Sequence, residues 1–335
     1  MIKNDLYRGV IIVPEVITMG EALIDFVPRQ VNCALHEVSD FHRAAGGAPA
    51  NVAVGVARLG VSAGFMGKVG DDAFGYFLKK TLEDNKVNTS QMVLTEEAMT
   101  TLAFVSLRGD GERDFAFYRK PGADMLYRVE EVDFDYLEGS HIFHFGSISL
   151  ITDPSKTTTL KLIKQARSKG VTVSFDPNIR PPLWGSLEEA VKQINQVIPE
   201  ADILKINEEE LKVLTGLNDL KEESILKACQ EFYQKGPELI IVTLGGEGCF
   251  YYSSAGYGMV EGFKTKAIDT TGAGDSFVAA VLSSLVKADL TNLQGLSTKK
   301  LEEILTFANK VASIVVTRNG GIPSLPFIDE VEGGS

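Results

Sequence analysis

The chain has 335 residues, of which 44% are hydrophobic and 23% are charged. These values are typical of a globular protein with one large α/β domain or two smaller ones. The formal net charge of −12, with no basic stripe in the sequence, argues against nucleic acid as a partner because nucleic-acid phosphates would be repelled.

Cysteine usage and hydropathy point to a cytoplasmic protein. The three cysteines are far apart, and none forms a CxxC pair: Cys33, Cys229 and Cys249. Neither a disulfide scaffold nor a structural zinc site is expected, and a reducing compartment fits. The apolar run Val10–Val13 is ended by Pro14 and Glu15 and is too short for a signal or membrane segment.

Short apolar runs alternate with helical patterns along the chain, which predicts a three-layer α/β fold with a mostly parallel central sheet. We expect strands at residues 16–19, 63–68, 141–145, 171–175, 202–206 and 239–244. Helices are expected at residues 49–59, 71–86, 273–286 and 298–317. No linker or repeat divides the chain, so we expect one domain over residues 16–326.

Two segments depart from this alternation. Residues 100–107 and 114–119 flank Gly109-Asp110-Gly111-Glu112, which is a hairpin signal, and residues 26–41 alternate without a helical period. Together they predict a small antiparallel sheet, from segments at about 26–43 and 100–120, that stands off the core as a lid, a dimer surface or both. Four of its apolar residues could cover either a partner chain or the chain's own site: Phe104, Val105, Phe115 and Phe117.

Polar groups and glycines follow several predicted strands, where open α/β sheets bind ligands. Asp25 follows the first strand, and Gly46 and Gly47 precede a helix whose first turn holds Asn51. Backbone N–H groups there, with Asn51, could bind sugar hydroxyls. The alternative for the glycines is a loop-to-helix junction that needs them for its dihedral angles, and the alternative for Asp25 is an exposed loop acid.

Three further segments also follow predicted strands. Asp176-Pro177-Asn178-Ile179-Arg180 places an acid, an amide and a guanidinium together, either as a polar ligand site or as a turn with a surface arginine. Asn207-Glu208-Glu209-Glu210 has the form of a helix N-cap with acids in the first turn. Thr243-Leu244-Gly245-Gly246-Glu247-Gly248 would let a nucleotide approach the backbone, although one Gly-rich loop is a weak signal.

The most informative motif is Asp269-Thr270-Thr271-Gly272-Ala273-Gly274-Asp275, which precedes a helix-compatible apolar run. Small residues at a helix start expose backbone N–H groups, and the helix dipole favours an anion there. A carboxylate inside an anion site is electrostatically unfavourable unless it has a chemical role there. In phosphoryl transfer the N–H groups stabilise the transferring phosphoryl group, while the acid accepts the proton of the attacking hydroxyl.

Other reaction classes lack their motifs in this sequence. There is no GxxxxGK[ST], no protein-kinase motif set and no GxSxG. A nicotinamide-dependent oxidoreductase would share the α/β pattern, but no GxGxxG follows the first strand.

The order of these motifs, from about Val16 to Pro326, resembles the ribokinase-like (PfkB) carbohydrate kinase family. The most specific matches are Gly46-Gly47-xxx-Asn51 and the segment Asp269–Asp275. Within the family, three further groups look like fructokinases: Gly20-Glu21-xxx-Ile24-Asp25-Phe26; Phe117-Tyr118-Arg119 with Pro121-Gly122-Ala123-Asp124; and Asp176-Pro177-Asn178-xxx-Arg180 with Leu183-Trp184.

The resemblance implies a role for each matching position. Asp275 would be the catalytic base, with an anion hole formed by the N–H groups of Gly272, Ala273, Gly274 and Asp275. Sugar contacts would come from Asp25, Gly46, Gly47, Asn51, Arg119 and Arg180. Asn207 and Glu210 would order Mg²⁺ and its waters, and the nucleotide would lie against Thr243, Gly245, Gly248 and Asn309. A K⁺ site would use loop oxygens at Asp269, Thr271, Val315, Arg318, Gly320 and Ser324.

The implied activity is transfer of the γ-phosphoryl group of MgATP to the 6-hydroxyl of D-fructose, with ATP and the sugar as small-molecule partners. Two alternatives remain open in the sequence. A 2-keto-3-deoxygluconate kinase would use Arg119 and Arg180 to bind a substrate carboxylate. A sugar-binding regulatory protein would retain the site without turnover, although the intact Asp275 and glycine loop weigh against it. Homodimerisation through the lid also remains an open expectation.

Overall fold

The computed structural model describes residues 13–30, 34–107, 113–291 and 293–333. In this part of the chain, nine strands form the main sheet in the order β13-β12-β11-β10-β9-β8-β1-β4-β5. The strands of this sheet are β1 (Val16–Met19), β4 (Ala63–Gly70), β5 (Asn88–Thr95), β8 (Ile142–Gly146), β9 (Thr172–Asp176), β10 (Ile203–Asn207), β11 (Leu239–Thr243), β12 (Gly248–Ser253) and β13 (Gly256–Glu261).

Pairing from β5 through β11 is parallel, and only the two pairs that join β11, β12 and β13 are antiparallel. The predicted fold class is therefore confirmed. Each predicted strand is present within two residues of its expected bounds. The sequence analysis missed β5, β12 and β13. In β13 only Val260 is buried, so this edge strand carries little of the apolar signal that marks the inner strands.

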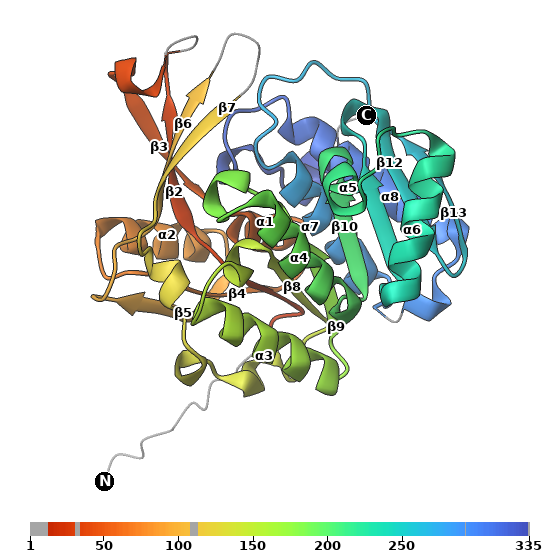
Figure 1. Cartoon of the computed structure of the whole chain (residues 1–335), viewed down its shortest axis with the longest axis horizontal. Coiled ribbons are helices and arrows are strands. Elements are labelled where there is room, and N and C mark those ends of the chain that lie inside the picture. The colour runs from red at the N-terminus through yellow and green to blue at the C-terminus, as the bar shows by residue number, and fades with distance from the viewer. Residues whose placement is uncertain (1–12, 31–33, 108–112, 292, 334–335) are drawn as a thin grey trace.

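Helices cover both faces of the main sheet (Figure 1). One face carries α1 (Ala48–Arg58), α2 (Ala73–Asp84), α7 (Ala273–Lys287) and α8 (Thr298–Val315). The other carries α3 (Ser155–Ser168), α4 (Leu187–Val197), α5 (Glu208–Thr215) and α6 (Glu222–Lys235), and the short α9 (Ile328–Glu332) follows α8. Among the described residues, no helix combines the length and apolar character that crossing a bilayer requires.

The hydrophobic core lies in two clusters, one on each side of the sheet. Along β11, Leu239 and Ile241 join one cluster, whereas Ile240 and Val242 join the other. Successive side chains of a strand point to opposite faces, so a strand buried on both sides must be apolar throughout. Burial on both faces therefore explains why this segment is a continuous apolar run in the sequence.

A second, four-stranded sheet stands off the main body (Figure 1) and is called the lid below. Its strands are β2 (Leu23–Pro28), β3 (Phe41–Gly46), β6 (Leu102–Leu107) and β7 (Arg113–Tyr118). The prediction of a wholly antiparallel sheet is wrong at its centre, because the two hairpins meet through the parallel pair β2–β6. The predicted turn at residues 109–112 lies outside the described residues.

Helices α1 and α7 pack closely at a glycine. A Cβ atom added to Gly55 of α1 would lie 2.6 Å from the Cβ of Ala279 in α7. The two helices can pack this closely only because residue 55 has no side chain. This contact fixes the first turn of α7 relative to the first turn of α1, and both turns line the site described next.

We predict that Gly55→Val destabilises the protein by about 1–3 kcal/mol, because the added methyl groups force the two helices apart. Urea unfolding followed by circular dichroism measures the effect. Gly295→Val is the matched control, since a Cβ there meets no atom within 4 Å. Equal free energies of unfolding for the two variants would contradict a close α1–α7 contact.

Candidate active site

A cleft of about 1310 Å³ opens between the lid and the carboxyl ends of the central strands. Most of the residues singled out in the sequence line it: Asp25, Gly47, Asn51, Arg180, Asn207, Thr243, Gly245, Gly248, Thr271, Gly272, Ala273, Gly274, Asp275 and Asn309. Segments from the first fifty residues and from the last seventy thus meet in one site. The other predicted residues lie behind this lining or to one side of it, as described below.

Asp275 lies in the first turn of α7 and is buried beneath the cleft surface. The side-chain amide of Asn51 in α1 donates a 2.7 Å hydrogen bond to Asp275 Oδ2. Burial raises the pKa of Asp275 to about 6, and the Asn51 bond opposes part of that rise because it favours the charged form. The carboxylate is therefore held in one orientation and titrates near neutral pH.

The start of α7 presents backbone N–H groups to the cleft. Gly272 is the N-cap with φ of 78°, a left-handed conformation that suits glycine. Gly274 and Asp275 occupy the second and third helical positions, where an α-helix offers the N–H no partner of its own. The Ala273 N–H donates to the Thr270 carbonyl at 3.2 Å, so its membership of the anion hole stays a prediction.

At the lid end of the cleft, Glu21 and Asp25 flank the glycine loop. Glu21 Oε1 accepts a 3.1 Å hydrogen bond from the Ala48 N–H, which opens α1. Burial raises the pKa of Glu21 to about 7. A Cβ on Gly47 would clash with the Glu21 carbonyl, and one on Gly46 with the Asp25 carboxylate. Both glycines are thus required by close approach, and Gly46 supports the cleft wall from behind.

Arg119 does not reach the cleft lining in this conformation. It follows lid strand β7, and its guanidinium pairs with the Asp124 carboxylate at 2.6 and 2.7 Å, with both side chains almost fully buried. Thr101, which precedes β6, also donates to Asp124, at 2.5 Å. One carboxylate therefore holds both ends of the lid hairpin β6–β7. The predicted contact between Arg119 and a substrate stays a prediction.

The floor of the cleft carries a lysine that the sequence analysis did not single out. Lys205 Nζ, on β10, donates a 2.9 Å hydrogen bond to Asp176 Oδ2, at the end of β9. Burial would lower the pKa of Lys205, but the Asp176 and Glu210 carboxylates outweigh it and leave the pKa raised. A lysine inside the apolar run Ile203–Ile206 was the available signal, because a buried strand seldom holds a charge without a partner.

Asn207 and Glu210 form a capping box at the start of α5. Asn207 Oδ1 accepts from the Glu210 N–H at 2.8 Å, and Glu210 Oε2 accepts from the Asn207 N–H at 2.9 Å. Glu210 Oε1 accepts a further bond from the Ile179 N–H at 2.7 Å, and burial raises the pKa of Glu210. Glu208 and Glu209 line the cleft instead, a position that the N-cap pattern alone did not reveal.

The opposite end of the cleft lies between the β11–β12 loop and α8. Gly248 has φ of 109°, and a Cβ there would clash with the Val260 carbonyl, so only glycine fits. Asn309 of α8 donates through Nδ2 to the carbonyls of Val260 and Glu261, each at 3.1 Å. These contacts hold β13 against α8 and shape a glycine-lined recess beside Thr243 and Gly245.

Behind the start of α7, two loops meet at the predicted K⁺ positions. Asp269 joins them, since its carboxylate accepts from the Thr271 N–H at 2.7 Å and from the Gly320 N–H at 3.0 Å. Arg318 donates to the Ser324 carbonyl at 3.5 Å, and the Val315 carbonyl accepts from the Arg318 N–H at 3.0 Å. In the part of the chain described here, no cluster of three or more His, Cys, Asp or Glu side chains is arranged to hold a metal ion.

Comparison with known proteins places these features in a family. The model of the pfkB family carbohydrate kinases matches residues 13–328. Fructokinase-1 of Zea mays is 46% identical over 316 residues, which cover 94% of this chain and 96% of that protein.

Solved structures agree with this result. Fructokinase from Xylella fastidiosa with bound ATP superposes with a TM-score of 0.85 at 34% identity, covering 96% of this chain and 98% of that one. A double mutant of fructokinase from Vibrio cholerae O395, with fructose, ADP and potassium bound, gives 0.84 at 32% identity, with the same coverage.

We predict that Asp124→Ala destabilises the protein by about 3–5 kcal/mol, because it leaves the Arg119 guanidinium buried without its partner. Differential scanning calorimetry or urea unfolding measures this. Glu97→Ala is the control: Glu97 also pairs with an arginine at 2.6 Å, but that pair is exposed and its loss should cost at most about 1 kcal/mol. A loss as small as the control's would show that the Arg119–Asp124 pair does not anchor the lid.

Proposed function

The chain belongs to the pfkB family of carbohydrate kinases and is an ATP-dependent fructokinase, and we propose that Asp275 is the general base of its reaction. One observation supports this proposal above the others. The Asp275 carboxylate is buried, has a pKa of about 6 and accepts a hydrogen bond from Asn51. It lies in the first turn of α7, the same turn that offers N–H groups to an anion. Base and anion site are thus adjacent, as phosphoryl transfer requires.

The proposed reaction is a direct in-line transfer. The 6-hydroxyl oxygen of fructose forms a bond to the γ-phosphorus as the bond from that phosphorus to the ADP oxygen breaks, and the hydroxyl proton passes to Asp275. The N–H groups of Gly274 and Asp275 stabilise the charge on the transferring group. Arg180, which lines the cleft and lowers the pKa of Asp275, supplies a positive charge on the same side.

We place the sugar at the lid end of the cleft. Asp25, Gly47 and Asn51 line this end, and the buried Asn51 Oδ1 has no hydrogen-bond partner among the described residues. An amide oxygen left in that state favours a hydroxyl donor from a ligand, because a buried acceptor without a donor is costly. Gly46 acts indirectly by leaving room for Asp25.

We place the nucleotide at the recess formed by Thr243, Gly245, Gly248 and Asn309. Mg²⁺ bound to it would neutralise phosphate charge during transfer. The carboxylates and the amide of Asn207, Glu208 and Glu209 face this part of the cleft and provide the oxygen ligands or water contacts that Mg²⁺ prefers. Glu210 holds Asn207 in position, since both of its carboxylate oxygens accept backbone hydrogen bonds.

The two alternatives from the sequence are less favoured. A ketodeoxygluconate substrate needs arginines for its carboxylate, and Arg119 is already paired with Asp124. A regulatory protein without turnover would have no need of a base so closely held beside an anion site. We propose the cytoplasm as the location, which microscopy of a C-terminal fluorescent fusion would test.

The pH dependence of turnover tests the base. Because only the ionised carboxylate accepts a proton, kcat/KM should fall about tenfold per pH unit below the Asp275 pKa of about 6 and level off above it. Steady-state rates of ADP release with saturating MgATP and varied fructose, from pH 4.5 to 8.5, measure this profile.

Asp275→Asn is the control for that profile. The amide cannot take the proton, so kcat should fall about 10²–10⁴-fold and the acid limb should disappear. Fructose and ATP should still bind, as isothermal titration would show. Near-normal turnover by the folded variant would sink the assignment.

We also propose that K⁺ binds between the loops joined by Asp269. Most of the possible ligand atoms there are carboxylate and carbonyl oxygens, which hard cations prefer. We expect K⁺ to raise kcat by about tenfold over tetramethylammonium, because a cation behind α7 strengthens the anion site. A K⁺-dependent rise in melting temperature would report binding without turnover. Equal rates and equal melting temperatures in both salts would contradict the site.

Finally, we propose that two chains associate through the outer face of the lid. Phe26, Phe41, Phe104 and Tyr118 form a ring cluster on that face, with centroids 4.7–6.4 Å apart between neighbours. Tyr118 is 67% exposed. Phe117 lines the chain's own cleft, Val105 is buried, and the Phe115 side chain lies outside the described residues.

Light scattering after gel filtration should therefore give a dimer for the native chain and a monomer for Tyr118→Glu. Tyr257→Glu, at another exposed tyrosine, which lies on edge strand β13, should remain dimeric. A native monomer at micromolar concentration would argue against association through the lid.

A further inference from the structure

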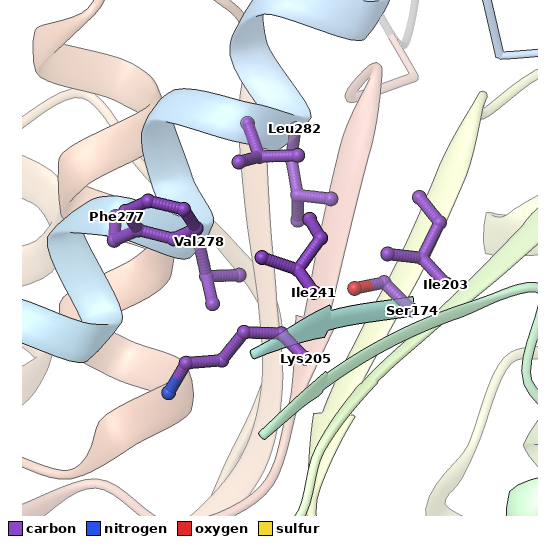
Figure 2. A pocket seen from close by; sticks show the side chains of 8 residues that line it. Ser174, Ile203, Lys205, Ile241, Phe277, Val278 and Leu282 are labelled. Atoms are coloured by element: carbon purple, nitrogen blue, oxygen red, sulfur yellow. The ribbon is translucent and has the colours of Figure 1, made fainter. Parts of the chain in front are cut away.

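Lys205 crosses the floor of the cleft toward the helix that carries the catalytic turn. Figure 2 shows its side chain extending from its strand toward the helix with Phe277, Val278 and Leu282. An ideal Cβ on Gly274 would lie only 3.1 Å from Lys205 Nζ. The ammonium group therefore lies against the first turn of α7, whose N–H groups form the anion site. It also lines the cleft itself.

The carboxylates of Asp176, Glu210 and Asp275 favour the charged form of Lys205, but the helix end beside its ammonium group does not. A helix N-terminus carries a partial positive charge, so a cation placed there is repelled by the helix dipole. The commoner arrangement places acids at helix N-termini and bases at C-termini. A cation at this end adds to the positive potential that an incoming anion experiences.

Its partners account for only part of its bonding capacity. The 2.9 Å bond to Asp176 uses one of the three ammonium protons, and no other hydrogen bond from Nζ is found among the described residues. A cavity of about 10 Å³ borders Lys205, Ser174 and Phe277, roughly the room of one water molecule. The Asp176 pair keeps the lysine charged, while the remaining protons stay available toward α7 and the cleft.

We propose that Lys205 is a positioning residue for phosphoryl transfer, which supplies a fixed positive charge beneath the anion hole of Gly274 and Asp275. It acts through the first turn of α7 and not on the sugar. Its effect is largest in the transition state, because the transferring group then carries charge that the ground state places elsewhere. This inference rests on the proposed placement of the phosphoryl group at α7.

The test is binding of a transition-state mimic. ADP with aluminium fluoride, Mg²⁺ and fructose imitates the phosphoryl group in flight, whereas ADP alone does not. We expect Lys205→Met to weaken binding of the mimic about 10²-fold and lower kcat by a similar factor, as loss of one anion-hole group does. The dissociation constant of ADP and the KM for fructose should change less than threefold.

Lys68→Met is the matched control. Lys68 is also fully buried and paired with an acid, Glu131 at 2.6 Å, but it lies outside the cleft lining. Lys68→Met should lower the free energy of unfolding, while the ratio of the dissociation constants of ADP and of the mimic stays at the native value. An unchanged ratio in folded Lys205→Met would overturn the proposal, because a purely structural lysine behaves in this way.

A double variant keeps the test decisive if Lys205→Met does not fold. Lys205→Met with Asp176→Leu removes both buried charges together, which proteins often tolerate better than the loss of one. Removing Asp176 also removes a negative charge, and this loss by itself strengthens the binding of an anion. Weaker binding of the mimic by the double variant would therefore support the role of Lys205, and native binding would refute it. Neither measurement needs Asp275 as a base, so failure of that assignment is recognised separately in Asp275→Asn.

Discussion

The hydrogen bond between Asn51 and Asp275 is the constraint on which the site depends. It joins residues that are 224 positions apart and sit in the first turns of α1 and α7. The two helices can hold this bond because Gly55 lets their backbones approach. One turn brings the glycine loop that we assign to the sugar, and the other brings the N–H groups that we assign to the phosphoryl group. The bond thereby fixes the two proposed binding regions relative to each other.

Charge is concentrated at this site at a cost to stability. Glu21, Asp176, Glu210 and Asp275 are all buried near the cleft, and the pKa of three of them is raised. Burying ions is seldom the most stable arrangement, since apolar residues of similar volume often do better. The cluster is therefore better explained by the reaction than by the fold. Burial raises the pKa of Glu21 to about 7 and that of Asp275 to about 6, so these two carboxyls can exchange protons near physiological pH.

Much of the fold followed from the sequence because its signals are local. Parallel strands buried on both faces are apolar without interruption, and helix starts carry caps that can be recognised in one segment. The motif at residues 269–275 marked the start of α7 for the same reason. The pairing of β2 with β6 was not visible, because a parallel contact between two hairpins leaves no local pattern.

Side-chain partners were the part that the sequence could not supply. Arg119 was expected at the substrate, but which acid it meets depends on how the β7 end packs against Asp124. Glu208 and Glu210 are two residues apart in one helical turn, and only the direction of that helix decides which one faces the cleft. Lys205 left a local signal that the sequence analysis did not use, because a charge inside a buried strand seldom occurs without a partner.

The path of the chain through the lid has one more consequence. The hairpin β2–β3 is inserted between β1 and α1, so its two ends are Glu21 and the Gly46–Gly47 loop (Figure 1). The lid is therefore covalently continuous with the end of the cleft to which we assign the sugar, and the recess at Thr243 and Asn309 lies on another part of the chain. The glycine loop that we assign to the sugar is thus tied to the lid through the backbone, whereas the recess that we assign to the nucleotide is not.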